Sequence, residues 1–229
     1  LIDQKTMQTI QTRLPHAFLY GEGWSMPSLY DEAFYARLSQ AKKQTSLAYF
    51  NDRSRDFIAG ALDASKEGIL DFENLDMEKA LLYLTGDLEN MAYAQQNIHY
   101  IECHDNLTLA DRLMLQKHTE KEAQFLMEVL LASQGHVLLQ IGQSFFRSKQ
   151  FLANTYRSPD EINLIEWERL SQYQSLNESI SQAIKIRRHR GDLMKTEIED
   201  WKLKLWYEHV LIVIDFKEKV VSYDENVCK

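Results

Sequence analysis

Four short apolar runs alternate with amphipathic segments along most of the chain. The runs predict strands, and they span residues 17–20, 46–50, 98–101 and 136–141. Segments with apolar residues at helical spacing lie between and around these runs, at 3–13, 31–41, 55–62, 77–84, 109–115, 120–132 and 175–189. Short continuous apolar strands that alternate with helices are typical of a parallel sheet. The pattern therefore predicts an α/β unit over residues 1–193.

The pattern changes after Gly191. Apolar and polar residues now follow one another in runs at 201–206, 210–216 and 220–223, with a tight turn expected at Lys217-Glu218. Consecutive strands with short turns are typical of antiparallel sheets. Residues 194–229 thus predict the first strands of an all-β sandwich, with too few strands to bury a core of their own.

Composition and charge narrow the range of ligands. The 229 residues are 45% hydrophobic and 26% charged, with a net charge of −8, so a packed core is expected. This acidic balance argues against a general nucleic-acid binder, which would carry a basic face, and suits a neutral ligand. No run of 18 apolar residues is present, so we expect no membrane span. The chain begins without Met and without a signal-peptide pattern, and we expect it to be part of a longer protein.

Cysteine usage predicts neither a disulfide framework nor a metal centre. The two cysteines, Cys103 and Cys228, are far apart in the sequence, and no Cys/His spacing of the metal-binding type occurs. We therefore expect no cofactor, and nothing in the pattern indicates a calcium site. Free thiols also fit a reducing compartment, which predicts a cytoplasmic location.

The first candidate for chemistry is the sequence Tyr-Gly-Glu-Gly-Trp at residues 20–24. Glu22 follows the first predicted strand, and its flanking glycines allow a substrate to approach the backbone closely. The indole of Trp24 can shield a carboxyl group from water, which suits a general acid. A solvated glutamate in an ordinary turn has the same local pattern, so both interpretations stay open.

The second candidate is the sequence Ile-Glu-Cys-His-Asp-Asn at residues 101–106, which follows the third predicted strand. Asp105 suits the stabilisation of positive charge on a sugar ring, and the imidazole of His104 can donate to a sugar hydroxyl. An Asp-Asn turn before the helix predicted at 109–115 is the structural alternative.

Two further segments are polar or basic. The loop at 154–163 contains Tyr156 and Asp160 and could line a cleft after the fourth strand, or could be a turn followed by a helix cap. The basic run at 187–190 closes a predicted helix, where positive charge suits the helix dipole, so we do not interpret it as a nucleic-acid site.

Together these motifs resemble the α-amylase superfamily of glycoside hydrolases, and most closely the type I pullulanases. Residues 20–24 resemble the general-acid segment on the fifth barrel strand, and residues 100–109 resemble the seventh-strand segment. The segment 51–56 is similar to the one after the sixth strand, and 143–149, 154–163 and Trp167 are similar to the eighth strand and its loop. The matches occur in order and cover about residues 1–190.

The resemblance implies a fold and a set of roles. The fold would be the C-terminal half, strands five to eight, of a (β/α)8 barrel, followed by the start of a β-sandwich. Glu22 would be the general acid/base, and Asp105 would stabilise the transition state. The implied substrate contacts are Trp24, His104, Asn106, Tyr156 and Asp160. The implied reaction is retaining hydrolysis of α-1,6 bonds in an α-glucan such as pullulan.

One part of the implied site is missing from the sequence. The family nucleophile is an aspartate in a segment like Phe-Arg-Phe-Asp, and nothing here matches it; Asp3 belongs to the first predicted helix. We therefore expect these residues alone to be inactive, and to need an N-terminal half-barrel or to self-associate. A non-catalytic glucan-binding or assembly fragment, and an isoamylase-like or α-1,4-acting relative, are the alternatives.

Overall fold

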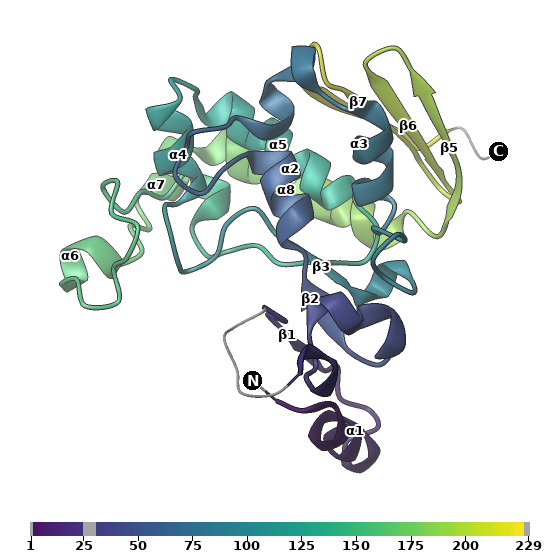
Figure 1. Cartoon of the computed structure of the whole chain (residues 1–229). Coiled ribbons are helices and arrows are strands. Elements are labelled where there is room, and N and C mark those ends of the chain that lie inside the picture. The colour runs from purple at the N-terminus through teal and green to yellow at the C-terminus, as the bar shows by residue number, and fades with distance from the viewer. Residues whose placement is uncertain (1, 25–30, 227–229) are drawn as a thin grey trace.

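A computed structural model of the chain describes residues 2–24 and 31–226, which form two sheets with a helical layer between them (Figure 1). The first sheet is parallel throughout and follows the chain order: β1 (Tyr20–Gly21), β2 (Ala48–Phe50), β3 (Asn97–His99) and β4 (His136–Val137). The predicted parallel α/β unit is confirmed. The strands are shorter than the apolar runs, because residues such as Ile101 are buried without belonging to the ladder.

The helices follow their local capping signals. Their bounds are α1 (Gln4–Arg13), α2 (Asp52–Ala59), α3 (Met77–Leu84), α4 (Leu109–Leu115), α5 (Glu120–Ala132), α6 (Asp160–Asn163), α7 (Arg169–Gln172) and α8 (Gln174–His189). The predicted bounds of α3, α4 and α5 are confirmed. Each of these helices begins after an N-cap residue whose side chain accepts a hydrogen bond from a backbone amide of the first turn. These N-cap residues are Asp76, Thr108 and Thr119 respectively.

The helix predicted at 31–41 is wrong. Two 3₁₀ turns, Glu32–Phe34 and Leu38–Lys43, take its place. Between them the chain is drawn into pairing with the N-terminal segment: Tyr35 bridges Asp3, and the amide of Ala36 donates to the carbonyl of Ile2. These contacts are distant in sequence, and they override the local helical spacing.

The second sheet is antiparallel and contains β5 (Leu193–Glu199), β6 (Lys202–Tyr207), β7 (Leu211–Asp215) and β8 (Val220–Asp224). The three strands predicted after Gly191 are confirmed, and β5 is an additional one. Alternate side chains of β6 and β7 are buried in the same core cluster as the inner side of α5. The rings of Phe125 and Phe216 meet edge to face at 6.2 Å across this junction. The second sheet thus shares a core with the helices, and a domain boundary near residue 193 stays a prediction.

The C-terminal end of α5 is closed by two arginines from the end of α8. Arg187 donates to the carbonyls of Leu131 and Ser133 at 2.7 and 2.5 Å, and Arg190 donates to the carbonyl of Ala132 at 2.8 Å. Helix carbonyls in the last turn have no partner inside the helix, so these guanidinium groups satisfy them. This structural role supports the interpretation of the basic run as a helix terminus.

Two glycines close the loop between α2 and α3. Gly60 and Gly68 both have positive φ, +73° and +61°. A Cβ atom on Gly60 would lie 1.9 Å from the carbonyl oxygen of Lys66, and one on Gly68 would lie 2.5 Å from the nitrogen of Gly60. Only glycine fits at either position, and the close approach of the backbone at Gly60 and Gly68 makes residues 61–67 a closed loop.

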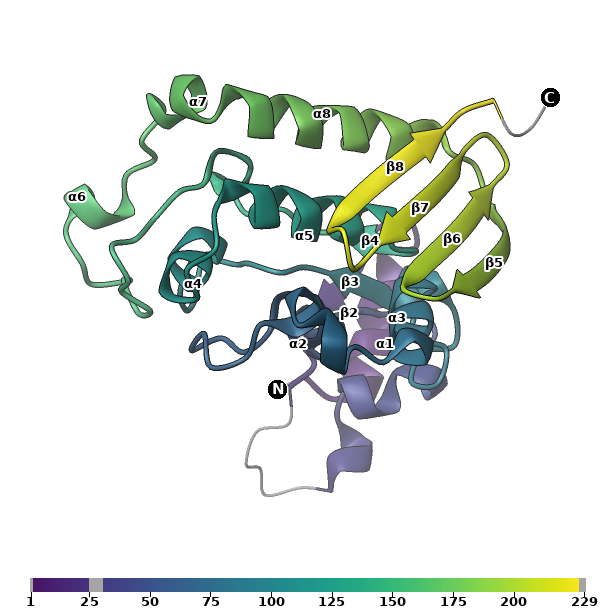
Figure 2. The same cartoon turned by 90° about the horizontal axis from the view of Figure 1, so that it is seen from above.

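Two hydrophobic clusters support the fold. The larger one includes most of α5 and the buried side chains of α8 and of the antiparallel sheet. The smaller one contains Ala41, Leu47, Tyr49 and Met91, and it supports β1 and α1. Figure 2 shows the antiparallel sheet on one side of the molecule, and α6 with the loop that follows β3 on the other.

Candidate functional site

The candidate site lies where the parallel strands end. Glu22 follows β1 directly, and residues 102–106 follow β3. The carboxyl ends of parallel strands lie at the same end of a sheet, so both segments lie at the carboxyl end of this one. Only β2 separates β1 from β3, so the ends of these two strands lie two strand spacings, about 10 Å, apart.

A small cavity adjoins Glu22. It has a volume of about 230 Å³ and is lined by residues that include Tyr20, Glu22, Trp24 and Tyr49. Gly23 has φ +67°, and a Cβ there would lie 2.5 Å from the ring of Tyr49, so the turn depends on glycine. Among the described residues, Glu22 is the one acidic side chain that lines this cavity. Its carboxylate is exposed, and the Trp24 side chain beside it is 40% exposed.

The loop after β3 carries an exposed histidine–aspartate pair. His104 Nε2 lies 3.5 Å from Asp105 Oδ2, and their side chains are 79% and 55% exposed. Asn106 follows in the left-handed region with φ +63°, which turns the chain toward α4. The predicted site residues of this loop are therefore adjacent and open to a ligand.

The same loop begins with a buried acid, Glu102. Its Oε2 accepts a hydrogen bond of 2.7 Å from the amide of Leu109, whereas its Oε1 has no hydrogen-bond partner among the described residues. Burial raises the pKa of Glu102 to about 7, and the Leu109 amide and the positive charges of Arg112, Arg147 and Lys149 act in the opposite direction. Glu102 thus fastens the two ends of the loop together.

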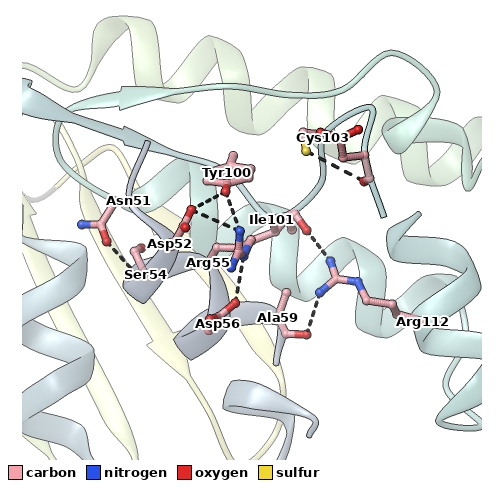
Figure 3. Close-up of polar contacts among 11 residues, drawn as sticks. Asn51, Asp52, Ser54, Arg55, Asp56, Ala59, Tyr100, Ile101, Cys103 and Arg112 are labelled. Atoms are coloured by element: carbon pink, nitrogen blue, oxygen red, sulfur yellow. Dashed lines mark hydrogen bonds and ion pairs between the residues drawn. The ribbon is translucent and has the colours of Figure 1, made fainter. Parts of the chain in front are cut away.

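A polar network connects α2 to the end of β3 (Figure 3). The hydroxyl of Tyr100 donates to Asp52 at 2.5 Å and accepts from Arg55 at 2.6 Å. Burial and the bond to Asp52 both raise the pKa of Tyr100. Arg112 of α4 donates to the carbonyls of Ile101 and Ala59. These contacts hold the backbone just before Glu102 in place.

Sequence patterns did not reveal this supporting layer. Glu102, Arg112 and Lys149 are almost fully buried. In the sequence they look like ordinary charged residues of loops and helix surfaces, and the lone cue is that Glu102 directly follows an apolar strand.

The remaining predicted contacts lie on a separate lobe. Asp160 begins α6, which Figure 1 shows extending away from the helical layer, and Tyr156 precedes it with a 74% exposed side chain. The guanidinium of Arg157 lies 5.1 Å from the centre of the Tyr156 ring. The structure therefore groups Glu22 with Trp24, and His104 with Asp105 and Asn106, while Tyr156 and Asp160 stand apart.

Residues 2–24 and 31–226 contain neither a metal-binding cluster nor a membrane-spanning helix. No group of three or more His, Cys, Asp or Glu side chains there is arranged to hold a metal ion. Cys103 is a half-buried free thiol, and Cys228 lies outside the described residues. None of the helices in these ranges is both long enough and apolar enough to span a membrane.

The chain is similar to pullulanases both in sequence and in structure. No protein-family model matches the chain. Pullulanase from Bacillus subtilis strain 168 is 28% identical over 187 residues, which cover 76% of this chain and 26% of that protein. The crystal structure of pullulanase from Anoxybacillus sp. LM18-11 superposes with a TM-score of 0.86 at 24% identity, over 94% of this chain and 35% of that one. Type I pullulanase from B. subtilis, in complex with maltose, superposes with a TM-score of 0.82 at 20% identity, over 94% and 36%.

Sequence similarity and the shared fold make the chain a relative of the pullulanases. It spans about a third of the length of the pullulanase structures it matches. The Anoxybacillus pullulanase has also been crystallised with maltotriose and with maltotetraose.

Proposed function

We propose that this chain supplies the general acid/base half of a pullulanase-type active site. Its parallel sheet corresponds to strands five to eight of a (β/α)8 barrel, and residues 194–229 correspond to the first strands of a β-sandwich. The observation that carries the proposal is that both motifs lie at the carboxyl end of the parallel sheet, where Glu22 follows β1 and His104–Asp105 follows β3. Sugar complexes of structurally similar pullulanases support an α-glucan as the ligand.

The proposed roles follow from exposure and chemistry. Glu22 is the general acid/base, and Asp105 stabilises positive charge that develops on the sugar ring. His104, with its largely exposed imidazole, binds the ring at the cleavage position, and Trp24 and Asn106 contact neighbouring groups. Tyr156 and Asp160 are the outer contacts, on the lobe that includes α6.

In this proposal the 229 residues bind glucan but do not cleave it. Retaining hydrolysis requires two carboxyl groups about 5–5.5 Å apart, one of them a nucleophile. Within the described part of the chain, the cavity at Glu22 contains no second carboxylate. The parent reaction is hydrolysis of α-1,6 bonds, and a nucleophile supplied from outside these residues would be needed for it.

Binding and hydrolysis can be tested separately. Calorimetric titration with maltotriose should show binding that Asp105→Asn weakens, while Asp63→Asn, which changes an exposed carboxylate outside the site, leaves it unchanged. Incubation of the same protein with pullulan should release no sugar. Absence of maltotriose binding would contradict the binding role, and release of maltotriose would contradict the inactivity. Release of products from linear but not branched glucans would instead indicate an α-1,4-acting relative.

An assembly role is favoured by a separate observation. Phe18, which precedes β1, and Tyr20, which begins it, are more than half exposed at the edge of the parallel sheet. The ring centres of Phe18 and His136 lie 4.3 Å apart. Exposed aromatic side chains on an edge strand favour association. We expect light scattering to show self-association that Tyr20→Ser reduces, and a monomer at all concentrations would exclude this role.

A further inference from the structure

A buried lysine connects the loop after β3 with the loop after β4. Lys149 lies in the second loop and is only 2% exposed. Its Nζ donates to the carbonyl of His104 at 3.1 Å and to the carbonyl of Ala153 at 3.3 Å. The ammonium group therefore holds the backbone of His104 from a different part of the chain.

The loop that carries Lys149 is itself fixed to α4. Asp111, which is fully buried, accepts from the hydroxyl of Ser148 at 2.5 Å and from the amide of Lys149 at 2.9 Å. Asp111 lies in the first turn of α4, whose N-cap is Thr108. The connection thus runs from α4 through Asp111 and Lys149 to the carbonyl of His104.

Burying an ammonium group is costly unless opposite charges and acceptors surround it. Glu102 and Asp111 supply the negative charge near Lys149, and Arg147 adds positive charge. Burial and Arg147 together lower the pKa of Lys149, while the two acids and the nearby thiol of Cys103 raise it. A neutral apolar side chain would fill this space without the desolvation cost, but it would not donate to the carbonyls of His104 and Ala153.

We propose that Lys149 is a positioning residue that sets the place of His104 and Asp105 from the loop after β4. The proposal rests on the proposed function insofar as His104 and Asp105 contact sugar. It adds that the segment 148–153 determines where that contact is made. A shift of this segment would move the carbonyl of His104, and with it the imidazole.

Cys103 offers a local reporter of this connection. It precedes His104 directly, its thiol is half-buried, and its Sγ lies 3.9 Å from the carbonyl oxygen of Asp105. In the Cys228→Ser background it is the single thiol of the chain, which has two cysteines. A change between variants in the rate at which a thiol reagent modifies it therefore reports a change in the exposure of the loop at 103–106.

The experiment compares modification rates at one pH in this background. Lys149→Met removes the ammonium but keeps a long apolar chain, and we expect modification to become roughly tenfold faster or more, as for loss of a charge-assisted hydrogen bond. Lys149→Arg retains donors and should stay within a few-fold of the parent. Lys121→Met, at an exposed position of α5, is the control and should match the parent.

An unchanged modification rate in a folded Lys149→Met protein would overturn the proposal. A rise in amide exchange across β6 and β7 as large as the rise in the modification rate of Cys103 would also overturn it, because it would show that the whole protein has loosened. If Lys149→Met does not fold, Ser148→Ala carries the test, because it loosens the same segment without removing a charge. Faster modification then supports the positioning role, and the parent rate contradicts it.

Maltotriose titration of the same variants keeps the two proposals apart. A parent protein that does not bind maltotriose, together with the expected modification rates, would leave the positioning role intact and reject the sugar site. Normal binding by the parent, with modification rates that Lys149→Met leaves unchanged, would reject the positioning role alone.

Discussion

The two halves of the candidate site rest on regions of very different packing. Glu22 follows a two-residue strand supported by the small cluster around Leu47 and Tyr49, beside a helix, α1, that has no buried residue. His104 and Asp105 follow β3, next to the large core that joins α5, α8 and the antiparallel sheet. Local contacts therefore hold one half of the site, whereas the global fold holds the other.

The largest expected effect is the loss of stability on truncating a core side chain, and it should differ between the two regions. Phe125→Ala removes a buried ring that joins α5 to Phe216, and it should lower the free energy of unfolding by about 3–5 kcal/mol. Leu47→Ala should instead raise amide exchange mainly around β1 and α1, with a smaller loss of global stability. Urea denaturation and hydrogen exchange of both variants check this; equal global losses would contradict the division.

A second effect concerns pH and the buried acid of the better-packed half. The pKa of Glu102 is about 7 in the folded protein and about 4.5 when unfolded, so the folded state binds more protons between these values. Its contribution to stability is therefore present below about pH 4.5 and is lost as the pH rises to 7. Between pH 4.5 and 7, the free energy of unfolding of the parent should fall by about 3 kcal/mol relative to that of Glu102→Gln.

Denaturation of both proteins at several pH values measures this difference. His99, whose pKa burial lowers to about 3, contributes with the opposite sign, but it is common to both proteins and cancels. A constant difference between parent and Glu102→Gln from pH 4.5 to 7 would show that Glu102 does not titrate in that window.

A third, smaller effect compares the helix caps of the two regions. Thr119→Ala breaks the capping box of α5 and should lower the free energy of global unfolding by about 1 kcal/mol. Asp3→Ala removes the N-cap of α1, and its effect should be confined to faster exchange within α1. Thermal unfolding distinguishes them, since a similar fall in midpoint for both would mean that α1 is part of the global unit.

The smallest effect is expected at an ion pair on the antiparallel sheet. Lys202 lies 3.1 Å from Asp215 across β6 and β7, with half of its side chain exposed. Lys202→Met should change the free energy of unfolding by about 0.5 kcal/mol or less, and added salt should reduce the difference further. A loss comparable to that of Phe125→Ala would show that charge, rather than apolar burial, holds this region.

The sequence predicted the elements whose signals are local. The bounds of α3, α4 and α5 could be predicted because Asp76, Thr108 and Thr119 cap them from adjacent positions. The strand lengths could not, because an apolar run indicates burial and the ladder ends sooner. The strand β5 was not predicted, since its exposed polar positions conceal the alternation.

The candidate site could be predicted in part for the same reason. Glu22 and Asp105 stand in short motifs directly after apolar runs, so their place at the strand ends could be inferred. Lys149 could not, because its contact with the carbonyl of His104 joins residues 45 positions apart. Nothing in a linear pattern separates a buried lysine from an exposed one.

The closed loop between Gly60 and Gly68 has an evolutionary consequence. Its two ends permit a single residue type, and the amide of Ala61 closes it by donating to the carbonyl of Lys66 at 3.1 Å. Selection at the two ends should therefore be strict, while residues 62–65, where the Asp63–Ser65 hydrogen bonds are local, should tolerate more change. Among descendants of this gene, we expect the loop interior to diverge early while the paired glycines are retained.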